Sequence, residues 1–180
     1  RSWETTVHGP DKLKAVLIHD KYETSLRLEA AISLIRMKPR QGRPIGIGIL
    51  VDGLASVSAE AQQSIVAALV PALIAELKKK PPPVPAAPGQ PATADPSFPY
   101  KDAAFAMLTS ERPIINDEGL KQSLKAAMVD WAMADFERRL DNRQQASGME
   151  QLLRLVGAPA VAGLPKLMTR DARRLDQMTS

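Results

Sequence analysis

Apolar residues recur at spacings of three and four along most of this chain, and this periodicity restricts its fold more than any other feature. Leu26, Ala30, Leu34 and Met37, for example, fall on one stripe of a helix drawn over residues 24–37. Only 4% of the residues are aromatic, whereas helix-favouring Ala, Leu, Glu, Lys and Arg are abundant. The sequence therefore predicts an all-α protein.

Helix start and stop signals divide the first part of the chain into four helices. Pro10 suits the first turn of a helix that begins near Gly9, and Ser58 is a good N-cap for a later one. Pro71 lies inside the fourth helix, where a missing backbone donor predicts a kink or a break. The four helices are expected from Gly9 through Leu17, from Tyr22 or Thr24 to Met37, over about 44–57, and over about 59–78.

The third of these helices carries three glycines, Gly46, Gly48 and Gly53. We expect Ile45, Ile49 and Leu54 to form its apolar ridge, and the glycines to permit a close approach of neighbouring helices. In the fourth helix the expected inner stripe has helical spacing and consists of Ile65, Ala68, Leu69, Leu73 and Leu77.

Residues 81–99 contain eight of the fifteen prolines and almost no core-forming side chains. Because proline removes backbone donors and restricts its neighbours, this segment is predicted to be a loop or linker without regular helix. It divides the chain into helices in residues 1–80 and further helices in residues 100–180. Whether it separates two domains or lies within one stack is left open.

After the Pro-rich segment the helical pattern resumes at Tyr100 and pauses at Glu111-Arg112-Pro113. The longest uninterrupted helix is expected over about 117–141, with acidic residues at its start and Arg138-Arg139 near its end, as the helix dipole favours. Its expected inward positions are Leu120, Leu124, Ala127, Met128, Trp131 and Phe136. Three shorter helices are predicted over 149–156, 158–168 and 170–178.

A self-similar pattern appears in three of the expected helices. Leu26-Arg27-x-x-Ala30-x-x-x-Leu34 is repeated as Tyr100-Lys101-x-x-Ala104-x-x-x-Leu108, and Ala61-Gln62-x-x-Ile65-x-x-x-Leu69 is a weaker copy. Start to start, the copies lie 35 and 39 residues apart, which fits a unit of two helices.

This pattern resembles the HEAT repeat, in which an Asp near the turn precedes a helix with an apolar-Arg-x-x-Ala-x-x-x-Leu motif. Asp20, Arg27, Ala30 and Leu34 match that motif, and residues 157–167 are similar to a HEAT first helix. The resemblance implies an α-solenoid of stacked antiparallel helix pairs, with structural roles for these four residues. It also implies an interaction between Asp20 and Arg27. A closed helical bundle is the competing architecture.

From the same resemblance we expect a non-catalytic, protein-binding scaffold or adaptor that needs no cofactor, most often as part of a larger chain or assembly. His8 and His19 have no partners at metal-ligand spacing, so no metal site is predicted. Gly46-Ile47-Gly48 is not followed by the third glycine of a dinucleotide fingerprint, and helix packing explains it better.

The alternative function is a nucleic-acid-binding or DNA-base-excising HEAT-like module. Trp131, Asp135 and Arg138 share one helical face, and residues 138–180 contain eight Lys or Arg against four Asp or Glu, which accounts for the net charge of +4. The competing interpretation is that Trp131 fills the core. Candidate binding residues are six of the seven arginines of the C-terminal part, Arg138, Arg139, Arg143, Arg154, Arg173 and Arg174.

Nothing in the composition fixes a compartment. There is no cysteine, and no apolar run is long enough to cross a bilayer. The chain opens on Arg1-Ser2-Trp3, which is typical of a processed or trimmed product. The location stays open between the cytoplasm and, if a signal or lipid-anchor segment was removed upstream, the cell envelope.

Overall fold

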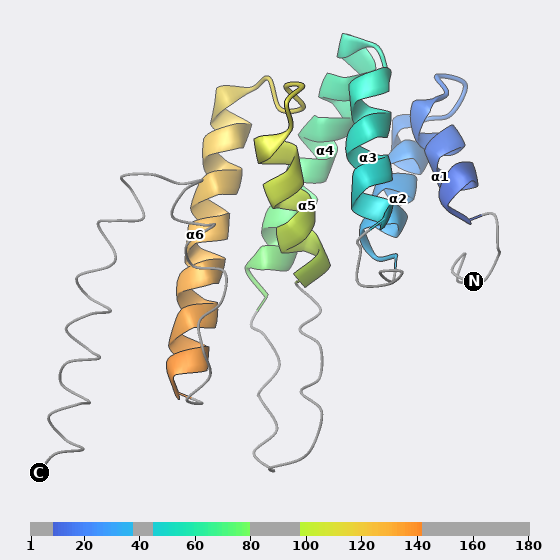
Figure 1. The fold of residues 1–180 in the computed structure, drawn as a ribbon. Coiled ribbons are helices and arrows are strands. Elements are labelled where there is room, and N and C mark those ends of the chain that lie inside the picture. Colours follow the sequence, from blue (N-terminus) through green and yellow to red (C-terminus); the bar gives the residue numbers. More distant parts are fainter. Residues whose placement is uncertain (1–8, 38–44, 80–97, 142–180) are drawn as a thin grey trace, which may run out of the picture. The chain divides into compact units, whose positions relative to one another are not determined.

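The structure, a computed structural model, describes residues 9–37, 45–79 and 98–141 (Figure 1). Every regular element in these ranges is an α-helix, which confirms the all-α prediction for the described part of the chain. The six helices are α1 (Gly9–Ile18), α2 (Thr24–Ile35), α3 (Ile45–Ser56), α4 (Ala59–Leu77), α5 (Phe98–Thr109) and α6 (Glu118–Asp141).

Most helix boundaries agree with the predicted signals. Pro10 lies in the first turn of α1, and the Ser58 hydroxyl accepts a hydrogen bond from the backbone N–H of Ala61 at 3.4 Å. Asp117 caps α6 in the same way, because its Oδ1 accepts from the Leu120 N–H at 2.9 Å. Two boundaries differ by two residues: α2 ends at Ile35 and not at Met37, and α5 begins at Phe98, so the last two residues of the predicted linker are helical. Proline at position 99 falls in the first turn, where its missing N–H is tolerated.

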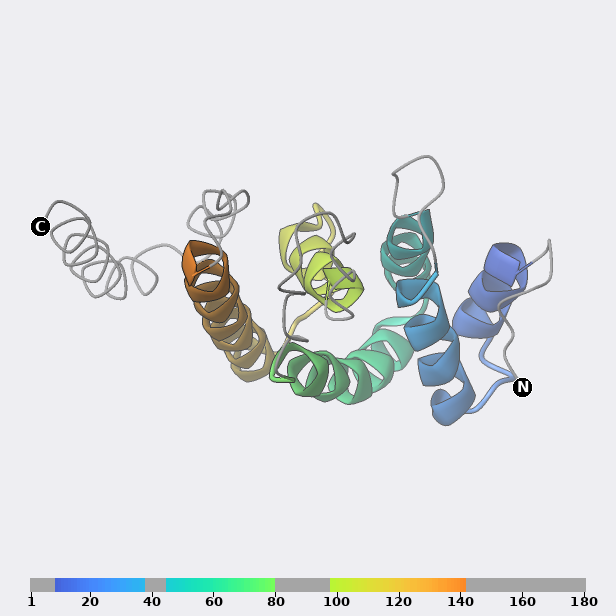
Figure 2. The same cartoon turned by 90° about the horizontal axis from the view of Figure 1, so that it is seen from below.

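Helices α1 to α5 lie in two layers. Seen from below, α1, α3 and α5 follow one another along one side, and α2 and α4 lie along the other (Figure 2). Helix α3 packs against α1, α2 and α5, while α5 also packs against α4 and α2. The helices before and after the Pro-rich segment therefore share one compact unit, which extends to Ala127.

Two glycines bring α3 close to its neighbours, as the sequence predicted. A Cβ added at Gly46 would lie 2.1 Å from the backbone carbonyl oxygen of Leu34 in α2. A Cβ at Gly53 would lie 2.7 Å from Cδ2 of Leu17 in α1. The glycines are seven residues apart, so they share one helical face, and that face is fixed against α1 and α2.

The pair α1–α2 and the pair α3–α4 each contain a hydrogen bond of the same kind, from a side chain of the second helix to a carbonyl near the end of the first helix. Arg27 is the fourth residue of α2, and its Nε donates to the carbonyl oxygen of Leu17 at 2.8 Å. Gln62 is the fourth residue of α4, and its Nε2 donates to the carbonyl oxygen of Leu54 at 2.9 Å. Both side chains are buried. The polar residues of the repeated pattern at positions 27 and 62 thus perform the same structural task.

The predicted interaction between Asp20 and Arg27 is not formed. Within the described ranges no hydrogen bond or ion pair joins them, since Asp20 is exposed while Arg27 points to the end of α1. Lys101, the third member of the pattern, pairs instead with its neighbour Asp102 at 2.9 Å. Its helix α5 lies in the layer of α1 and α3, so position 101 is not equivalent to position 27 (Figure 2).

The buried faces of α2 and α3 are rotated from those predicted. Ala30 and Leu34 are buried as expected, but Leu26 is 41% exposed, and buried Arg27 and Ala31 take its place on the inner face. In α3 the expected ridge is wrong at Ile45, which is 40% exposed, and Ile49 is only half-buried. In α3 the glycines account for this rotation, because the face that carries Gly46 and Gly53 points toward α2 and α1.

The fourth helix follows the predicted stripe closely. Ile65, Leu69, Leu73 and Leu77 are buried, while Ala68 is half-buried. The helix continues through Pro71, so of the two predicted outcomes, a kink or a break, the break does not occur. Ala67, whose carbonyl loses its partner at Pro71, is exposed, so solvent can reach that carbonyl, while packing holds the opposite face of the helix.

A second compact unit begins at Met128, within α6. In the described part of this unit, Met128, Trp131, Ala132 and Asp135 are buried. Of the other expected inward positions, Leu124 and Ala127 in the first unit are buried and Leu120 is half-buried, while the side chain of Phe136 lies outside the described residues. The helices predicted over 149–156, 158–168 and 170–178 also lie outside them.

Candidate interaction surface

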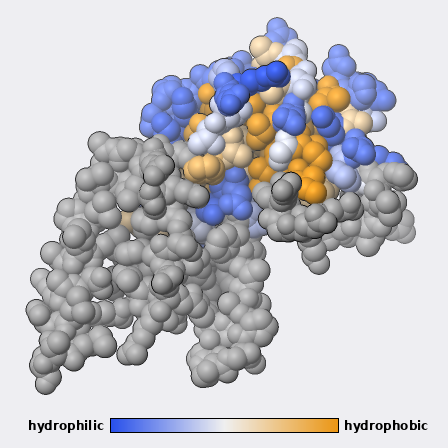
Figure 3. All heavy atoms as spheres, viewed as in Figure 1, coloured by the Kyte–Doolittle hydropathy of each residue, from blue (hydrophilic) through white to orange (hydrophobic). Residues whose placement is uncertain are grey.

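The outward side of α3 is a continuous stripe that we call the outer face of α3. It comprises the exposed or half-buried positions at helical spacing, Ile45, Gly48, Ile49, Asp52 and Ser56. Its first half is apolar and its second half is polar. Hydrophobic residues gather over α3 in the space-filling view from the same side as Figure 1 (Figure 3).

Packing on the opposite side holds this stripe in place. Leu50 and Leu54 are fully buried, and Gly46 and Gly53 lie directly against α2 and α1. Helix α3 therefore presents its outer face from a rigid position, since neither rotation nor retreat is possible without separating those contacts.

Gly48 differs from the other two glycines of the helix. A Cβ added there would meet no other atom of the described structure within 4 Å, apart from the helix itself, and the residue is exposed. A glycine inside a helix costs about 0.5–1 kcal/mol relative to alanine. No packing contact within the described chain explains this cost.

Asp52 gives the outer face its charge. It is the only charged residue of α3, and it lies three residues after Ile49 and four after Gly48, on the same stripe. Ser56 donates a hydrogen bond from its hydroxyl to the backbone carbonyl oxygen of Asp52 at 2.6 Å, and this bond does not involve the Asp52 carboxylate. The stripe therefore carries a negative charge at an exposed position one turn before its last residue, Ser56.

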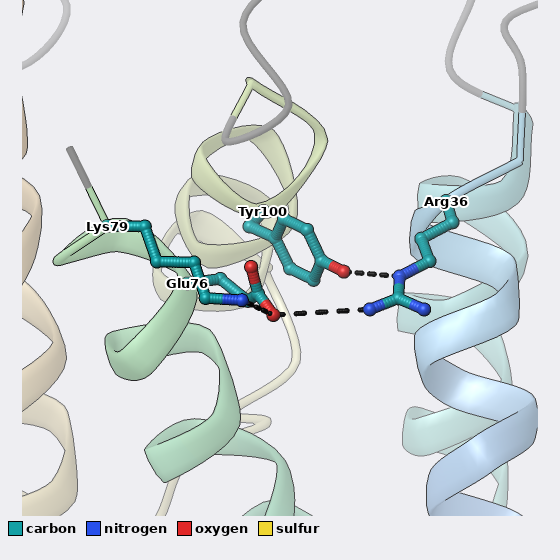
Figure 4. Close-up of polar contacts among 4 residues, drawn as sticks. All are labelled: Arg36, Glu76, Lys79 and Tyr100. Atoms are coloured by element: carbon teal, nitrogen blue, oxygen red, sulfur yellow. Dashed lines mark hydrogen bonds and ion pairs between the residues drawn. The ribbon is translucent and has the colours of Figure 1, made fainter. Parts of the chain in front are cut away.

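Apart from the outer face of α3, a cluster of polar side chains joins α2, α4 and α5 (Figure 4). Arg36, the C-cap of α2, donates from Nε to the hydroxyl of Tyr100, and its guanidinium carbon lies 5.8 Å from the centre of the tyrosine ring. Glu76 Oε1 lies 4.0 Å from Arg36 Nη2 and 2.7 Å from Lys79 Nζ. Because Tyr100 is buried, this cluster ties α5 to the helices that precede the Pro-rich segment.

The predicted structural residues occupy different environments. Ala30, Leu34 and Trp131 are buried and Arg27 is bound to the end of α1, whereas Asp20 is exposed. The side chains of the predicted binding arginines all lie outside the described residues, so the prediction is not tested. Arg138 and Arg139 belong to α6, but their side chains lie outside the described residues, as do Arg143, Arg154, Arg173 and Arg174 altogether.

Trp131 and Asp135, the residues behind the DNA-directed alternative, are 6% and 8% exposed. A base can stack only on a ring face that solvent reaches, so this arrangement favours a packing role for Trp131. His19 is exposed, and in the described ranges no three His, Asp or Glu residues gather where a metal ion would be held.

No helix within the described ranges has the length and apolar character to cross a membrane. Comparison of the chain with protein-family models, with known proteins and with solved structures finds no significant match.

Sequence reasoning missed the outer face of α3, because it treated Ile45 and Ile49 as inward positions. A usable signal was present: Gly46 and Gly53 share a face, and close helix packing requires that face to be the buried one. Sequence reasoning also missed the Arg36–Tyr100 contact, whose residues are 64 positions apart with no local pattern to link them.

Proposed function

We propose that this chain is a non-catalytic protein-binding scaffold, built as a HEAT-like α-solenoid, and that the outer face of α3 is a binding surface. The repeat proposal is supported by the matching hydrogen bonds of Arg27 and Gln62, which lie 35 residues apart and each reach back to the end of the preceding helix. Each bond lies within one helix pair, and a repeat architecture predicts that the same bond recurs in the next pair.

The binding proposal rests on one observation, the exposure of Ile45 beside Ile49 on a helix that is nearly free of charge. A single exposed isoleucine needs no explanation, but a contiguous apolar stripe on a rigid helix is typical of surfaces that a second protein covers. Stacked helical repeats form extended surfaces, and these surfaces commonly bind other proteins.

Site-specific photo-crosslinking in extracts of the source cells tests this proposal. We place a photoreactive residue at Ser56, at the end of the stripe, and in a control chain at Gln63, an exposed position of α4. The expected result is a discrete protein adduct at Ser56 that is lost when Ile49→Asp is added, under conditions where circular dichroism shows that the variant remains folded. Equal labelling at both positions, or an adduct that survives Ile49→Asp, would contradict the proposal.

A second measurement, the binding of duplex DNA as a function of salt concentration, distinguishes the scaffold proposal from the nucleic-acid-binding alternative. Phosphate contacts produce binding that falls steeply as salt rises. A scaffold should bind duplex DNA weakly and with little salt dependence, whereas tight, steeply salt-dependent binding would favour the alternative.

A further inference from the structure

We infer that the partner presents an α-helix that crosses the outer face of α3 at Gly48, with apolar side chains against Ile45 and Ile49 and a Lys or Arg near Asp52. This inference rests on the proposed binding function and specifies the chemistry of the partner. The juxtaposition that carries it is an unexplained exposed glycine, two isoleucines beside it and one carboxylate further along the same stripe.

Gly48 indicates how closely the partner approaches. In this same helix Gly46 receives a backbone carbonyl of α2, and Gly53 receives a leucine of α1, so α3 already uses missing side chains to admit other helices. Gly48 offers the same kind of opening on the outer side, but the described chain fills it with nothing. A helix whose backbone lies against Gly48 would fill this space, because small residues let two helices approach closely.

The isoleucines indicate what lies on either side of the crossing. Ile45 and Ile49 are separated by one helical turn, with Gly48 between them on the same face. Two ridges of branched side chains that flank a glycine form the groove into which the ridge of another helix packs. The partner helix therefore needs apolar residues at spacings of three and four.

Asp52 selects among apolar helices by charge. A second copy of α3 would bring no cation to this carboxylate, since Asp52 is the only charged residue in the helix. A partner with a Lys or Arg at the matching end complements the carboxylate, and a partner with Glu or Asp there meets repulsion. Charge complementarity therefore favours a basic amphipathic helix over a symmetric pairing of two α3 helices.

Two synthetic amphipathic peptides of equal length test the inference. Their Leu and Ala residues are identical, and the polar positions near the predicted Asp52 end are Lys in one and Glu in the other. Binding of each labelled peptide to the full chain is followed by fluorescence anisotropy. Because the chain carries a net charge of +4, overall electrostatics favours the Glu peptide. A preference for the Lys peptide must therefore come from a local carboxylate.

We expect the Lys peptide to bind roughly two to five times more tightly at low salt, as a single exposed ion pair allows. Asp52→Lys should reverse this preference, whereas Asp20→Lys, which makes the same charge change at an exposed turn, should not. Ile49→Asp should weaken both peptides about tenfold or more. An equal effect of Asp20→Lys and Asp52→Lys, or binding that survives Ile49→Asp, overturns the inference.

Gly48→Ala should change stability and peptide affinity in opposite directions, which a purely structural role of Gly48 would not produce. The added methyl group occupies open space and favours helix, so the midpoint of chemical denaturation should rise. Peptide binding should nevertheless weaken about fivefold or more, because the helix can no longer approach closely. Binding that improves together with stability overturns the close crossing, and self-association that Ile49→Asp abolishes would identify a second copy as the occupant.

Failure of this inference is distinguishable from failure of the proposed function. A specific adduct at Ser56 combined with no charge preference for the peptides would leave the binding surface in place and remove only the basic helix. Absence of the adduct would remove both.

Discussion

Arg27 donates a hydrogen bond from Nε to the backbone carbonyl oxygen of Leu17 at 2.8 Å, while its terminal Nη2 is buried with no hydrogen-bond partner in the described structure. The residue therefore holds the end of α1 against α2 without a carboxylate. Buried donors that lack acceptors carry a desolvation cost, so this contact is stabilising only through the hydrogen bond that it makes and the packing of its side chain.

Arg27→Ala should lower the free energy of unfolding by about 1–3 kcal/mol, since it removes the hydrogen bond to Leu17 and leaves a cavity. Arg27→Gln should lose less, because glutamine makes the equivalent bond at position 62. Urea denaturation compares the variants. In a double-mutant cycle, Asp20→Ala and Arg27→Ala should be additive within about 0.5 kcal/mol, as expected for residues that do not touch; larger coupling would restore the HEAT-type ion pair.

Alanine substitutions at two glycines of α3 should change the free energy of unfolding in opposite directions. Gly46→Ala should destabilise the chain by about 1–3 kcal/mol, because a backbone oxygen 2.1 Å away cannot yield as a flexible side chain can. Gly48→Ala should stabilise it by about 0.5–1 kcal/mol through helix propensity alone. Thermal or chemical denaturation measures both, and equal effects of the two would mean that α3 does not lie against the end of α2.

Tyr100→Phe tests the polar cluster that holds α5. The change removes the hydroxyl that accepts from Arg36 but keeps the ring, so the free energy of unfolding should fall by about 0.5–1.5 kcal/mol. Arg36→Ala in the Tyr100→Phe background should add less than it does alone. Full additivity would show that the two side chains act independently.

Glu118 predicts a local dependence on pH at the start of α6. The hydrogen bond from Gln122, together with the nearby charge of Lys121, lowers the pKa of Glu118 below its ordinary value of 4.5. A lowered pKa in the folded state means that the carboxylate stabilises the helix above pH 4.5, and that this contribution disappears as the pH falls through the folded pKa. Comparison of wild type with Glu118→Gln by pH-dependent denaturation should show convergence in acid; parallel curves would contradict the assignment.

Local signals predicted the helices well, because proline, serine and aspartate act within one turn. Pro10, Ser58 and Asp117 each lie at or next to the start of a helix for a stated steric or hydrogen-bonding reason. The exception is α5, which begins at Phe98 because proline is compatible with a first turn.

Helix orientation about the axis was harder to predict. Leu26 and Ile45 are large and apolar, so hydropathy alone points them inward, but close packing at Arg27 and Gly46 decides the rotation. Arg27 is the clearer case, since a charged residue took an inner position by finding a backbone carbonyl at the end of another helix. Such a partner is visible only once the helices are placed.

The outer face of α3 can be identified only when the rotation of α3 about its axis is known. The Arg36–Tyr100 contact can be identified only when the packing of α5 on the earlier helices is known. Neither follows from spacing within one helix. The C-terminal arginines illustrate the opposite case, where composition suggested a site and no described geometry bears on it.

The return of α5 onto α2, α3 and α4 also has a consequence for the order in which the molecule assembles. Helices α1 and α2 are neighbours in sequence, so their pairing closes a short loop, whereas Tyr100 must find Arg36 across 64 positions. Closing a long loop has a larger entropic cost, and distant contacts form slowly. We expect α5 to dock after the first two pairs have formed and to detach before them, so its amide hydrogens should exchange with solvent through a partial opening that leaves α1 and α2 protected.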